Sequence, residues 1–272
     1  MSKTIKPLTN EELKEKAPSL FCEQPYHEVS DKYHFIPTID IVEQLRSKSW
    51  FPVTVSEAGV RDSDKDGFQS HYVRFQSFSD LINPSANVVE LLLFNSHDRS
   101  KSFTISAGVY RYVCANGLVI ADSVFDSYKI KHLGERDNDV TNAVERITEV
   151  KPKLLDKITA FENIKLSQDE KEAFVQSSLP LRFESHLELD DANELLIPLR
   201  DEDMQDDLYT TLNILQENLL SSKISGYNKD TGRKFTSKEI TSISKDVEIN
   251  KGLWDIAERI ASIKDHSYPM AT

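Results

Sequence analysis

The sequence predicts an α+β fold, with an antiparallel β-meander in the N-terminal half packed with helices and a helical C-terminal half. Two observations lead to this prediction. Up to about residue 136 the chain contains short runs in which apolar residues alternate or are continuous, which is typical of strands. From residue 139 apolar residues recur every three or four positions, which is typical of helices. We expect residues 1–136 to form a β-rich core with short N-terminal helices, and residues 137–272 to form a helical region packed on the same core.

Two short helices are expected near the N-terminus. Thr9 and Glu12 have the spacing of a capping box, in which a hydroxyl and a glutamate satisfy the exposed N–H groups of a first helical turn. Pro18 should end that helix. The stretch 39–48 carries apolar residues at helical spacing, so we expect a second short helix that packs on the core.

The expected strands follow one another closely, which favours a meander of antiparallel neighbours. The run 88–94 is apolar at nearly every position, as a central strand covered on both faces requires, because successive side chains point to opposite sides. A polar turn follows, and the next run alternates between apolar and polar residues. The expected strands are 51–57, 68–78, 88–94 and 102–113, with 118–120 and 128–132 as extensions.

One residue of the last long strand is anomalous. The alternation places Arg111 on the apolar side between Val109 and Val113, where a charge is costly unless it is paired or a bulge at Gly108 re-aims it. The strand then ends in a segment that contains Asn116-Gly117. This dipeptide favours the positive φ angles of a tight turn, so we expect the chain to reverse there.

In the second half, the pattern predicts several helices. A stripe that begins at Val140 is interrupted by Pro152, which removes an N–H bond and clashes with the preceding turn, so we expect a kink or a break near Val150. A second capping box begins at Ser167. Further helices are expected at about 208–219 and 247–264, with a loop at 225–232 between them. The first of these has four leucines at helical spacing, Leu208, Leu212, Leu215 and Leu219. The last helix repeats apolar residues in steps of four and three, the pattern of a bundle or oligomer seam, at Ile249, Leu253, Ile256, Ile260 and Ile263.

The composition is that of a soluble globular protein, and 272 residues are enough for a buried core. A formal charge of −12 and a pI near 5.1 oppose bulk attraction to nucleic acid or anionic membranes, but leave room for a local basic site. Two cysteines without a CxxC pair indicate neither a disulfide framework nor a cysteine zinc site. The polar N-terminus is unlike a signal peptide, and no apolar run is long enough to span a membrane. We therefore expect a cytoplasmic protein without membrane contact.

Motifs of common enzyme classes are missing from the sequence, and no cofactor is expected. The chain has no phosphate-binding glycine loop, dinucleotide fingerprint, zinc-protease motif or nucleophile elbow. A nucleophilic Cys114 beside Arg111 and His132 would make an enzyme. A small buried cysteine that ends a core strand is the simpler interpretation.

A metal site is not expected either. Asp62, Asp64 and Asp66 alternate as in calcium loops, but Gly67 stands one residue late and no glutamate closes the loop. The stretch is better interpreted as an exposed hairpin tip. The histidines are scattered along the chain, and such residues are more often hydrogen-bonded structural groups than ligands, which applies to His27, His34 and His132.

A strongly acidic segment lies in the helical half. It contains nine acidic residues and one basic residue, Arg200. Such a run is typical of a solvated loop or helix start; the functional alternative is a face that mimics DNA and occupies a nucleic-acid-binding protein. The acidic residues are Glu188, Asp190, Asp191, Glu194, Asp201, Glu202, Asp203, Asp206 and Asp207.

The hairpin region has the opposite charge balance. From Arg99 to Arg136 there are six basic and three acidic residues, so this segment carries +3 and the remainder −15. Aromatic residues are interleaved. Bases stack on aromatic rings while phosphates pair with cations, so the combination suits single-stranded nucleic acid, although the half-exposed face of any sheet also carries such residues. Tyr110 shares a strand face with Tyr112, as does Lys129 with Lys131, and the candidate contact residues are Arg99, Lys101, Tyr110, Arg111, Tyr112, Lys129, Lys131 and Arg136.

Short motifs in this region resemble those of a known family. Arg111-x-x-Cys114-x-Asn116-Gly117-Leu118, followed by Lys131-His132-x-Gly134, resembles a family of phage, prophage and plasmid proteins that is catalogued as a domain of unknown function. The likeness extends to Tyr33-x-x-Ile36-x-Thr38 upstream and to Leu253-Trp254 with Asp265-His266 downstream. The resemblance implies a mobile-element context and brings no activity with it.

The order of the expected elements resembles the core of phage single-strand annealing proteins of the beta, Erf and RecT type. Those proteins form rings or filaments that hold single strands against a basic groove. Our working hypothesis is a non-enzymatic, homo-oligomeric recombination protein of a mobile element that binds single-stranded DNA or RNA through the hairpin region. The alternative is an interaction protein that counters a host protein through its acidic surface; an enzyme is the third hypothesis.

Overall fold

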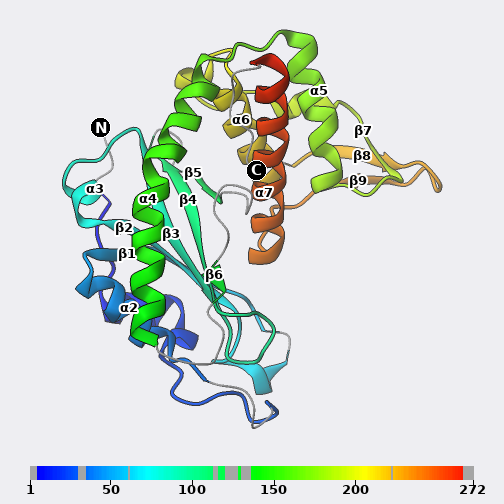
Figure 1. The fold of residues 1–272 in the computed structure, drawn as a ribbon. Helices are drawn as coiled ribbons and strands as arrows, with labels where there is room; N and C mark the ends of the chain where they lie inside the picture. Colours follow the sequence, from blue (N-terminus) through cyan, green and yellow to red (C-terminus); the bar gives the residue numbers. More distant parts are fainter. Residues whose placement is uncertain are drawn as a thin grey trace. The chain divides into compact units, whose positions relative to one another are not determined.

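The computed structural model describes most of the chain, and its contacts divide it into two compact units (Figure 1). Unit 1 comprises residues 1–117 and 125–152, and unit 2 comprises residues 118–124 and 153–272. The described residues are 5–29, 35–60, 62–112, 116–119, 128–129, 136–221 and 223–265, with the backbone alone described at 116–119, 128–129 and 136–140. The predicted α+β class is confirmed.

Unit 1 is built on an antiparallel meander, as predicted. Its strands follow the order β1-β2-β3-β4-β5, and β6 pairs with β4. The strand expected at 68–78 begins three residues later, at His71, and ends at Ser77, which caps a short helix by accepting a hydrogen bond from the Asp80 N–H. The strands are β1 (Trp50–Glu57), β2 (His71–Ser77), β3 (Asn87–Asn95), β4 (Thr104–Arg111), β5 (Asn116–Val119) and β6 (Tyr128–Lys129).

The expectation of a turn at Asn116-Gly117 is wrong. These two residues open strand β5, which lies next to β4 in the sheet. Local turn chemistry is only a preference, and pairing with a neighbouring strand outweighs it here.

Odd-numbered residues of β2, β3 and β4 share one face of the sheet, which we call the apolar face. The register pairs Val73 with Leu93 and Val89 with Val109, and all four side chains are buried. Short N-terminal helices supply further buried leucines and isoleucines. These helices of unit 1 are α1 (Asn10–Lys16), η1 (Pro18–Phe21) and α2 (Thr38–Ser47), followed along the chain by η2 (Ser63–Lys65) and α3 (Phe78–Ile82).

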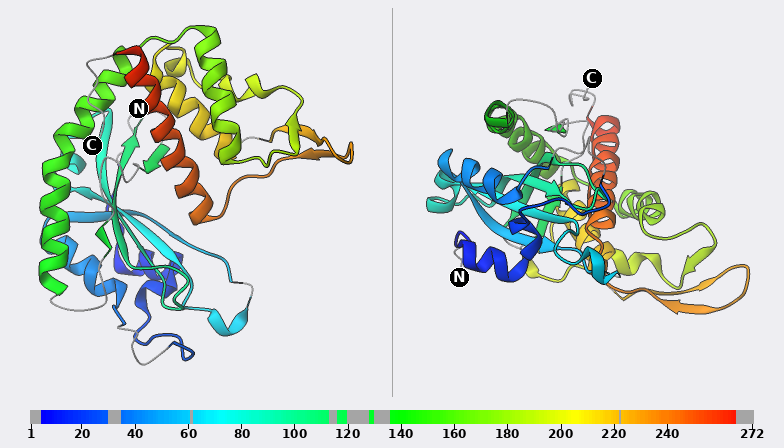
Figure 2. Two further views of the ribbon diagram at one scale, coloured as in Figure 1. Left: turned by 45° about the vertical axis from the view of Figure 1, so that its right-hand side comes forward. Right: turned by 90° about the horizontal axis from the view of Figure 1, so that it is seen from below.

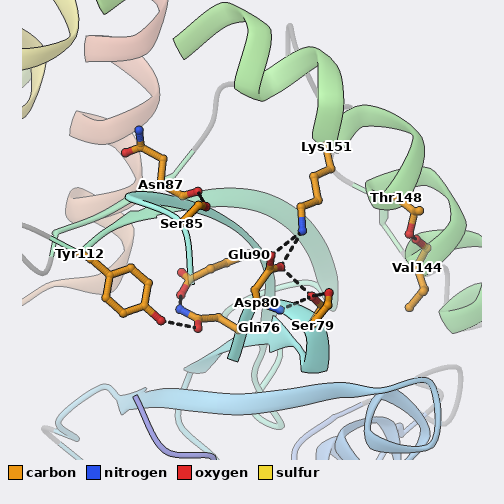
Figure 3. Close-up of polar contacts among 11 residues, drawn as sticks. Gln76, Ser79, Asp80, Ser85, Asn87, Glu90, Tyr112, Val144, Thr148 and Lys151 are labelled. Carbon is orange, nitrogen blue, oxygen red and sulfur yellow. Dashed lines mark hydrogen bonds and ion pairs between the residues drawn. The ribbon is translucent and has the colours of Figure 1, made fainter. Parts of the chain in front are cut away.

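The even-numbered residues of the same strands form the opposite face, which we call the polar face. Arg74, Gln76 and Glu90 lie there together with Ser106, and all four are buried. Figure 3 shows Gln76 and Glu90 on the side of the sheet from which Lys151 of helix α4 (Arg136–Asn163) reaches Asp80. The polar face is therefore the one that the first part of α4 covers.

Of the kink or break expected near Val150, a break does not occur, because α4 runs from Arg136 to Asn163 with Pro152 inside it. A helix-interior proline lacks the N–H that would bond to the carbonyl four residues earlier, here that of Thr148. In that preceding turn the Thr148 hydroxyl donates to the Val144 carbonyl at 2.7 Å (Figure 3). Buried residues before and after the proline, Ile147 and Leu154, keep the apolar stripe in register.

Unit 2 is mainly helical, as predicted for the C-terminal half. Ser167 caps α5 (Gln168–Ser178) through the expected capping box, and α6 (Leu208–Ser221) buries all four leucines of its predicted stripe. Phe161 and Trp254 meet in the core with ring centroids 5.2 Å apart. The remaining helical elements are η3 (Leu179–Leu181), η4 (Ala192–Leu196), η5 (Asp201–Asp203) and α7 (Ile243–Lys264).

Only part of the predicted seam of α7 faces inward. Ile249 and Leu253 are fully buried in unit 2, whereas Ile263 is 73% exposed. The buried stripe continues instead through Trp254, Ala257 and Ala261. The steps of four and three predict a bundle or oligomer seam, and in this helix the buried residues pack inside unit 2.

A small sheet in unit 2 was missed by the sequence pattern. β8 (Ser225–Asn228) and β9 (Lys234–Thr236) form a hairpin where a loop was expected, and β7 (Leu187–Leu189) pairs with β8 as an edge strand. Figure 2 shows this hairpin from two further sides. Among the described residues, no helix is long and apolar enough to cross a membrane.

Candidate nucleic-acid interface

Two tyrosines at the end of β4 are the candidate residues that the structure brings closest together. The rings of Tyr110 and Tyr112 lie 5.1 Å apart between centroids, edge to face at 88°, and both side chains are half-buried. This geometry is a favourable one for an aromatic pair. Tyr110 belongs to the polar face, and the hydroxyl of Tyr112 reaches the same face, where it donates to Oε1 of Gln76 at 3.2 Å (Figure 3).

A buried polar network supports this pair. Gln76 Nε2 donates to Oε1 of Glu90 at 2.9 Å, and Glu90 Oε2 accepts from the guanidinium of Arg74. The pKa of Tyr112 is raised, first by burial and then by the negative charges of Glu90 and Asp80. Its hydroxyl therefore stays protonated and remains a hydrogen-bond donor.

The carboxylates near the tyrosines are paired with cations. Glu90 pairs with Arg74, and both oxygens of Asp80 accept from Nζ of Lys151 at 2.8 and 2.6 Å. Asp80 also accepts from the Ser77 hydroxyl. A cation beside each carboxylate reduces the repulsion that these charges would exert on a phosphate near the tyrosine rings.

Arg111 lies between the tyrosines in sequence and on the opposite side of the sheet. It is only 9% exposed and faces Asn87 in the register, in line with Val109 on the apolar face. The sequence-based placement of this charge is confirmed, and no bulge re-aims it. Because its side chain is buried on that face, Arg111 cannot contact the same nucleic-acid strand as the two tyrosines.

The candidate cations lie at the other end of β4. Arg99 and Lys101 are exposed in the loop between β3 and β4, where Arg99 has a positive φ of 65°. Lys129 pairs along the backbone with Thr104 at the same end. Eight residues of strand separate this end from Arg111, or roughly 25 Å at about 3.3 Å per residue. The candidate residues therefore form two groups, with Arg136 described by its backbone alone at the start of α4 and Lys131 outside the described residues.

A second buried network lies on the apolar face. The His71 ring contacts the hydroxyl of Ser19 through Nδ1 at 2.6 Å and that of Thr38 through Nε2 at 2.9 Å. Nδ1 also lies 3.2 Å from the Gln69 carbonyl, which can only accept, so Nδ1 carries the proton and Nε2 accepts from Thr38. Asn95 in turn donates to the Thr38 hydroxyl at 2.9 Å.

His97 completes this histidine network. Its Nε2 is 3.4 Å from the Thr38 hydroxyl, and its ring centroid is 5.3 Å from that of His71. Burial, with the neighbouring His97 as a second cause, lowers the pKa of His71 to about 3, and burial lowers the pKa of His97 to about 4. Both rings are therefore neutral at pH 7, and their burial favours a structural role that ties η1 and α2 to the sheet.

The residues considered for metal and enzyme chemistry are only partly described. No group of three or more potential metal ligands of the His, Cys, Asp and Glu types occurs among the described residues. Asp62 caps η2 by accepting from the Asp64 N–H at 3.2 Å. Cys114 and His132, two of the three residues of the enzyme hypothesis, lie outside the described residues.

The acidic segment is less uniform than its sequence suggests. Asp203 is 3% exposed and accepts from Arg200 at 3.0 Å, and Asp207 is 4% exposed and caps α6 through the Thr210 N–H at 2.7 Å. Asp206 pairs with Lys171 at 2.5 Å. These carboxylates have partners within the protein, whereas Glu188, Asp190, Asp191, Glu194, Asp201 and Glu202 are exposed.

Comparison with known proteins places the chain in a family. The family model of DUF932, described as a domain of unknown function, matches residues 25–254. The chain belongs to this family. Two curated relatives, UPF0380 protein YafZ and UPF0380 protein YfjQ of Escherichia coli strain K12, are each 31% identical to it over 256 residues, which cover 94% of this chain and 92% of each relative. No solved structure matches the chain.

Several residues of the motifs quoted from the sequence are internal in this DUF932 chain. Thr38 is at the centre of the histidine network, and Leu253 and Trp254 are fully buried in α7. The sequence argument missed Gln76 and Glu90, although a glutamate inside an otherwise apolar strand was a usable signal. A buried charge in a central strand requires a partner on a neighbouring strand.

Proposed function

We propose that this DUF932 protein binds single-stranded nucleic acid through unit 1, with Tyr110 and Tyr112 stacking on bases. The observation that supports this best is the half-buried tyrosine pair, anchored through Gln76 on a polar sheet face. Aromatic rings held in place by hydrogen bonds lose little conformational freedom when a base stacks on them. The exposed Arg99 and Lys101, with Lys129, Lys131 and Arg136, are the proposed phosphate contacts.

The arrangement of unit 1 gives further support. Helix α2, the meander β1 to β4 and the long helix α4 follow the same order as the core of phage single-strand annealing proteins, which is a likeness of architecture. By this analogy the protein assembles into homo-oligomers and acts in recombination for a mobile genetic element. An oligomer would repeat the two groups of candidate residues along a bound strand, although they lie at opposite ends of β4 in one chain.

The tyrosine assignment is tested by binding of a fluorescently labelled oligothymidylate, measured by anisotropy. Tyr110→Ala should weaken binding about tenfold or more, since stacking of one base contributes about 1–3 kcal/mol. Tyr112→Phe keeps the ring but removes its hydrogen bond to Gln76, so it should weaken binding less than Tyr110→Ala does. Tyr227→Ala in unit 2 is the matched control. Equal affinities for all four proteins would refute the assignment.

The cation assignment is tested by charge reversal. Lys129→Glu with Lys131→Glu should weaken binding and make its dependence on salt concentration shallower, because fewer counterions are released. Size-exclusion chromatography with light scattering, with and without the oligonucleotide, reports the oligomer in the same experiment. A monomer that ignores the oligonucleotide at low salt would overturn the whole proposal.

A further inference from the structure

A groove in unit 2 lies beside the edge strand β7. It has a volume of about 670 Å³ and is bounded by α5 and η3 on one side and by β7 with the residues that follow it on the other. Its apolar floor is formed by Leu179, Pro180, Phe183, Leu187 and Leu189. Four of these, Leu179, Phe183, Leu187 and Leu189, are only partly exposed, so they line the groove and do not project fully into solvent.

The rim of this groove is acidic. Five carboxylates line it and a single lysine, Lys229, opposes them; the carboxylates are Glu172, Glu184, Glu188, Asp190 and Asp191. These carboxylates also affect Tyr227 in the neighbouring hairpin. The pKa of Tyr227 is raised by a hydrogen bond to Glu188, by burial, and by the charges of Glu188 and Asp190. A groove of this kind attracts a cationic ligand and repels phosphate.

Among the described residues, no strand pairs with the outer edge of β7. Lys229 N donates to the His186 carbonyl at 2.8 Å, and Asp190 N donates to the Ser225 carbonyl at 3.0 Å. Backbone groups of successive strand residues point to opposite edges, so the even-numbered residues bond to β8 and those of Leu187 and Leu189 point outward. The Leu187 N–H donates to the Glu184 carbonyl. The Leu189 N–H and the carbonyls of Leu187 and Leu189 are therefore the groups that a further strand would pair with.

From these features we propose that the groove binds an extended, lysine- or arginine-bearing segment of another protein, which adds to β7 as a fourth strand. Strand addition supplies main-chain hydrogen bonds, and alternate side chains of the added strand would reach the apolar floor and the acidic rim. Charge complementarity selects a basic segment over an acidic one. This site is separate from the tyrosines of unit 1 and does not depend on nucleic-acid binding.

The probe for this proposal is a short labelled peptide in which leucine and lysine alternate, added to the full chain and followed by fluorescence anisotropy. The same peptide with glutamate in place of lysine is the charge control. The lysine peptide should bind at least about tenfold more tightly, and raised salt should weaken it. Equal affinity for the two peptides would overturn the proposal.

The location is tested with two variants that remove the same charge. Glu188→Gln with Asp191→Asn neutralises two rim residues and should weaken binding of the lysine peptide about tenfold. Asp201→Asn with Glu202→Gln neutralises two exposed residues outside the groove and should leave the affinity unchanged. An equal loss in both variants would mean that net charge alone attracts the peptide, which contradicts a site at the groove.

Strand addition is tested on the peptide, so that folding of the protein is not at issue. Methylation of alternate backbone nitrogens removes the donors that would bond to β7 and should abolish binding when the methyl groups face the strand. Methylation of the other set should have little effect. If neither methylated peptide loses affinity, the segment does not pair with β7 and the proposal fails.

Discussion

The two faces of one sheet handle buried polar groups in different ways. His71 and Arg74 both lie on β2 and are both buried, but the histidine belongs to a neutral network of hydroxyls and an amide, and the arginine to an ion pair with Glu90. A neutral network loses little solvation energy on burial and becomes costly only when it is protonated. A buried ion pair has a different weakness, because removal of one member leaves the other charge buried and unpaired.

The largest effect should come from breaking the ion pair. Glu90→Gln removes the carboxylate beside Arg74 and should destabilise the protein by about 3–5 kcal/mol in urea denaturation. Glu90→Leu combined with Arg74→Met removes both charges from an enclosed site and should recover most of that loss. If Glu90→Gln alone is as stable as the original protein, the ion pair does not contribute to folding stability.

The histidine network should give the next largest effect, seen as acid sensitivity. The pKa values of His71 and His97 are about 3 and 4 in the folded protein, against about 6.5 in the unfolded chain. Between pH 6.5 and 4 the unfolded state therefore binds more protons, and the free energy of unfolding should fall as pH falls, by about 2–3 kcal/mol per unit at the steepest point.

A variant separates this effect from the titration of other groups. His71→Gln removes one titrating ring and should roughly halve the slope of the free energy of unfolding against pH below 6.5. Urea denaturation at several pH values measures both proteins. An unchanged slope would mean that the histidines are not the groups that sense acid.

The smallest effect should come from Ser106 on the polar face. Its hydroxyl oxygen is buried and has no hydrogen-bond partner among the described residues. Ser106→Ala removes a polar group that gains nothing from its surroundings, so the free energy of unfolding should rise by up to about 1 kcal/mol or stay the same. A clear loss of stability would reveal a partner for this hydroxyl and add Ser106 to the network of the polar face.

The sequence predicted the elements that depend on periodicity and caps. The capping boxes at Thr9 and Ser167, the stripe of α6 and the burial of Arg111 are local consequences of spacing, and all of them are confirmed. The β8–β9 hairpin was missed because its short strands have no apolar alternation, and partners on β7 hold it in place. Neighbouring strands, and not sequence spacing, determine such elements.

The candidate site was harder to predict for the same reason. Tyr110 and Tyr112 were placed on one side by alternation, but their support comes from Gln76, which is 36 residues away in the chain. Of the kink or break expected near Val150, the break does not occur, and buried residues on both sides of Pro152 can offset the loss of one hydrogen bond. The acidic segment was interpreted as a uniform surface because nothing in a run of charges shows which of them have internal partners.

The polar face of the sheet also bears on how the chain is made. The meander pairs strands that are neighbours in sequence, so it can assemble early, whereas Lys151 of the covering helix is 71 residues beyond its partner Asp80. During synthesis this face stays exposed to solvent until α4 emerges from the ribosome. Until α4 covers it, this face exposes Arg74, Gln76 and Glu90, which are hydrated. A hydrated face associates poorly with other nascent chains, so these residues protect the protein against aggregation before folding is complete.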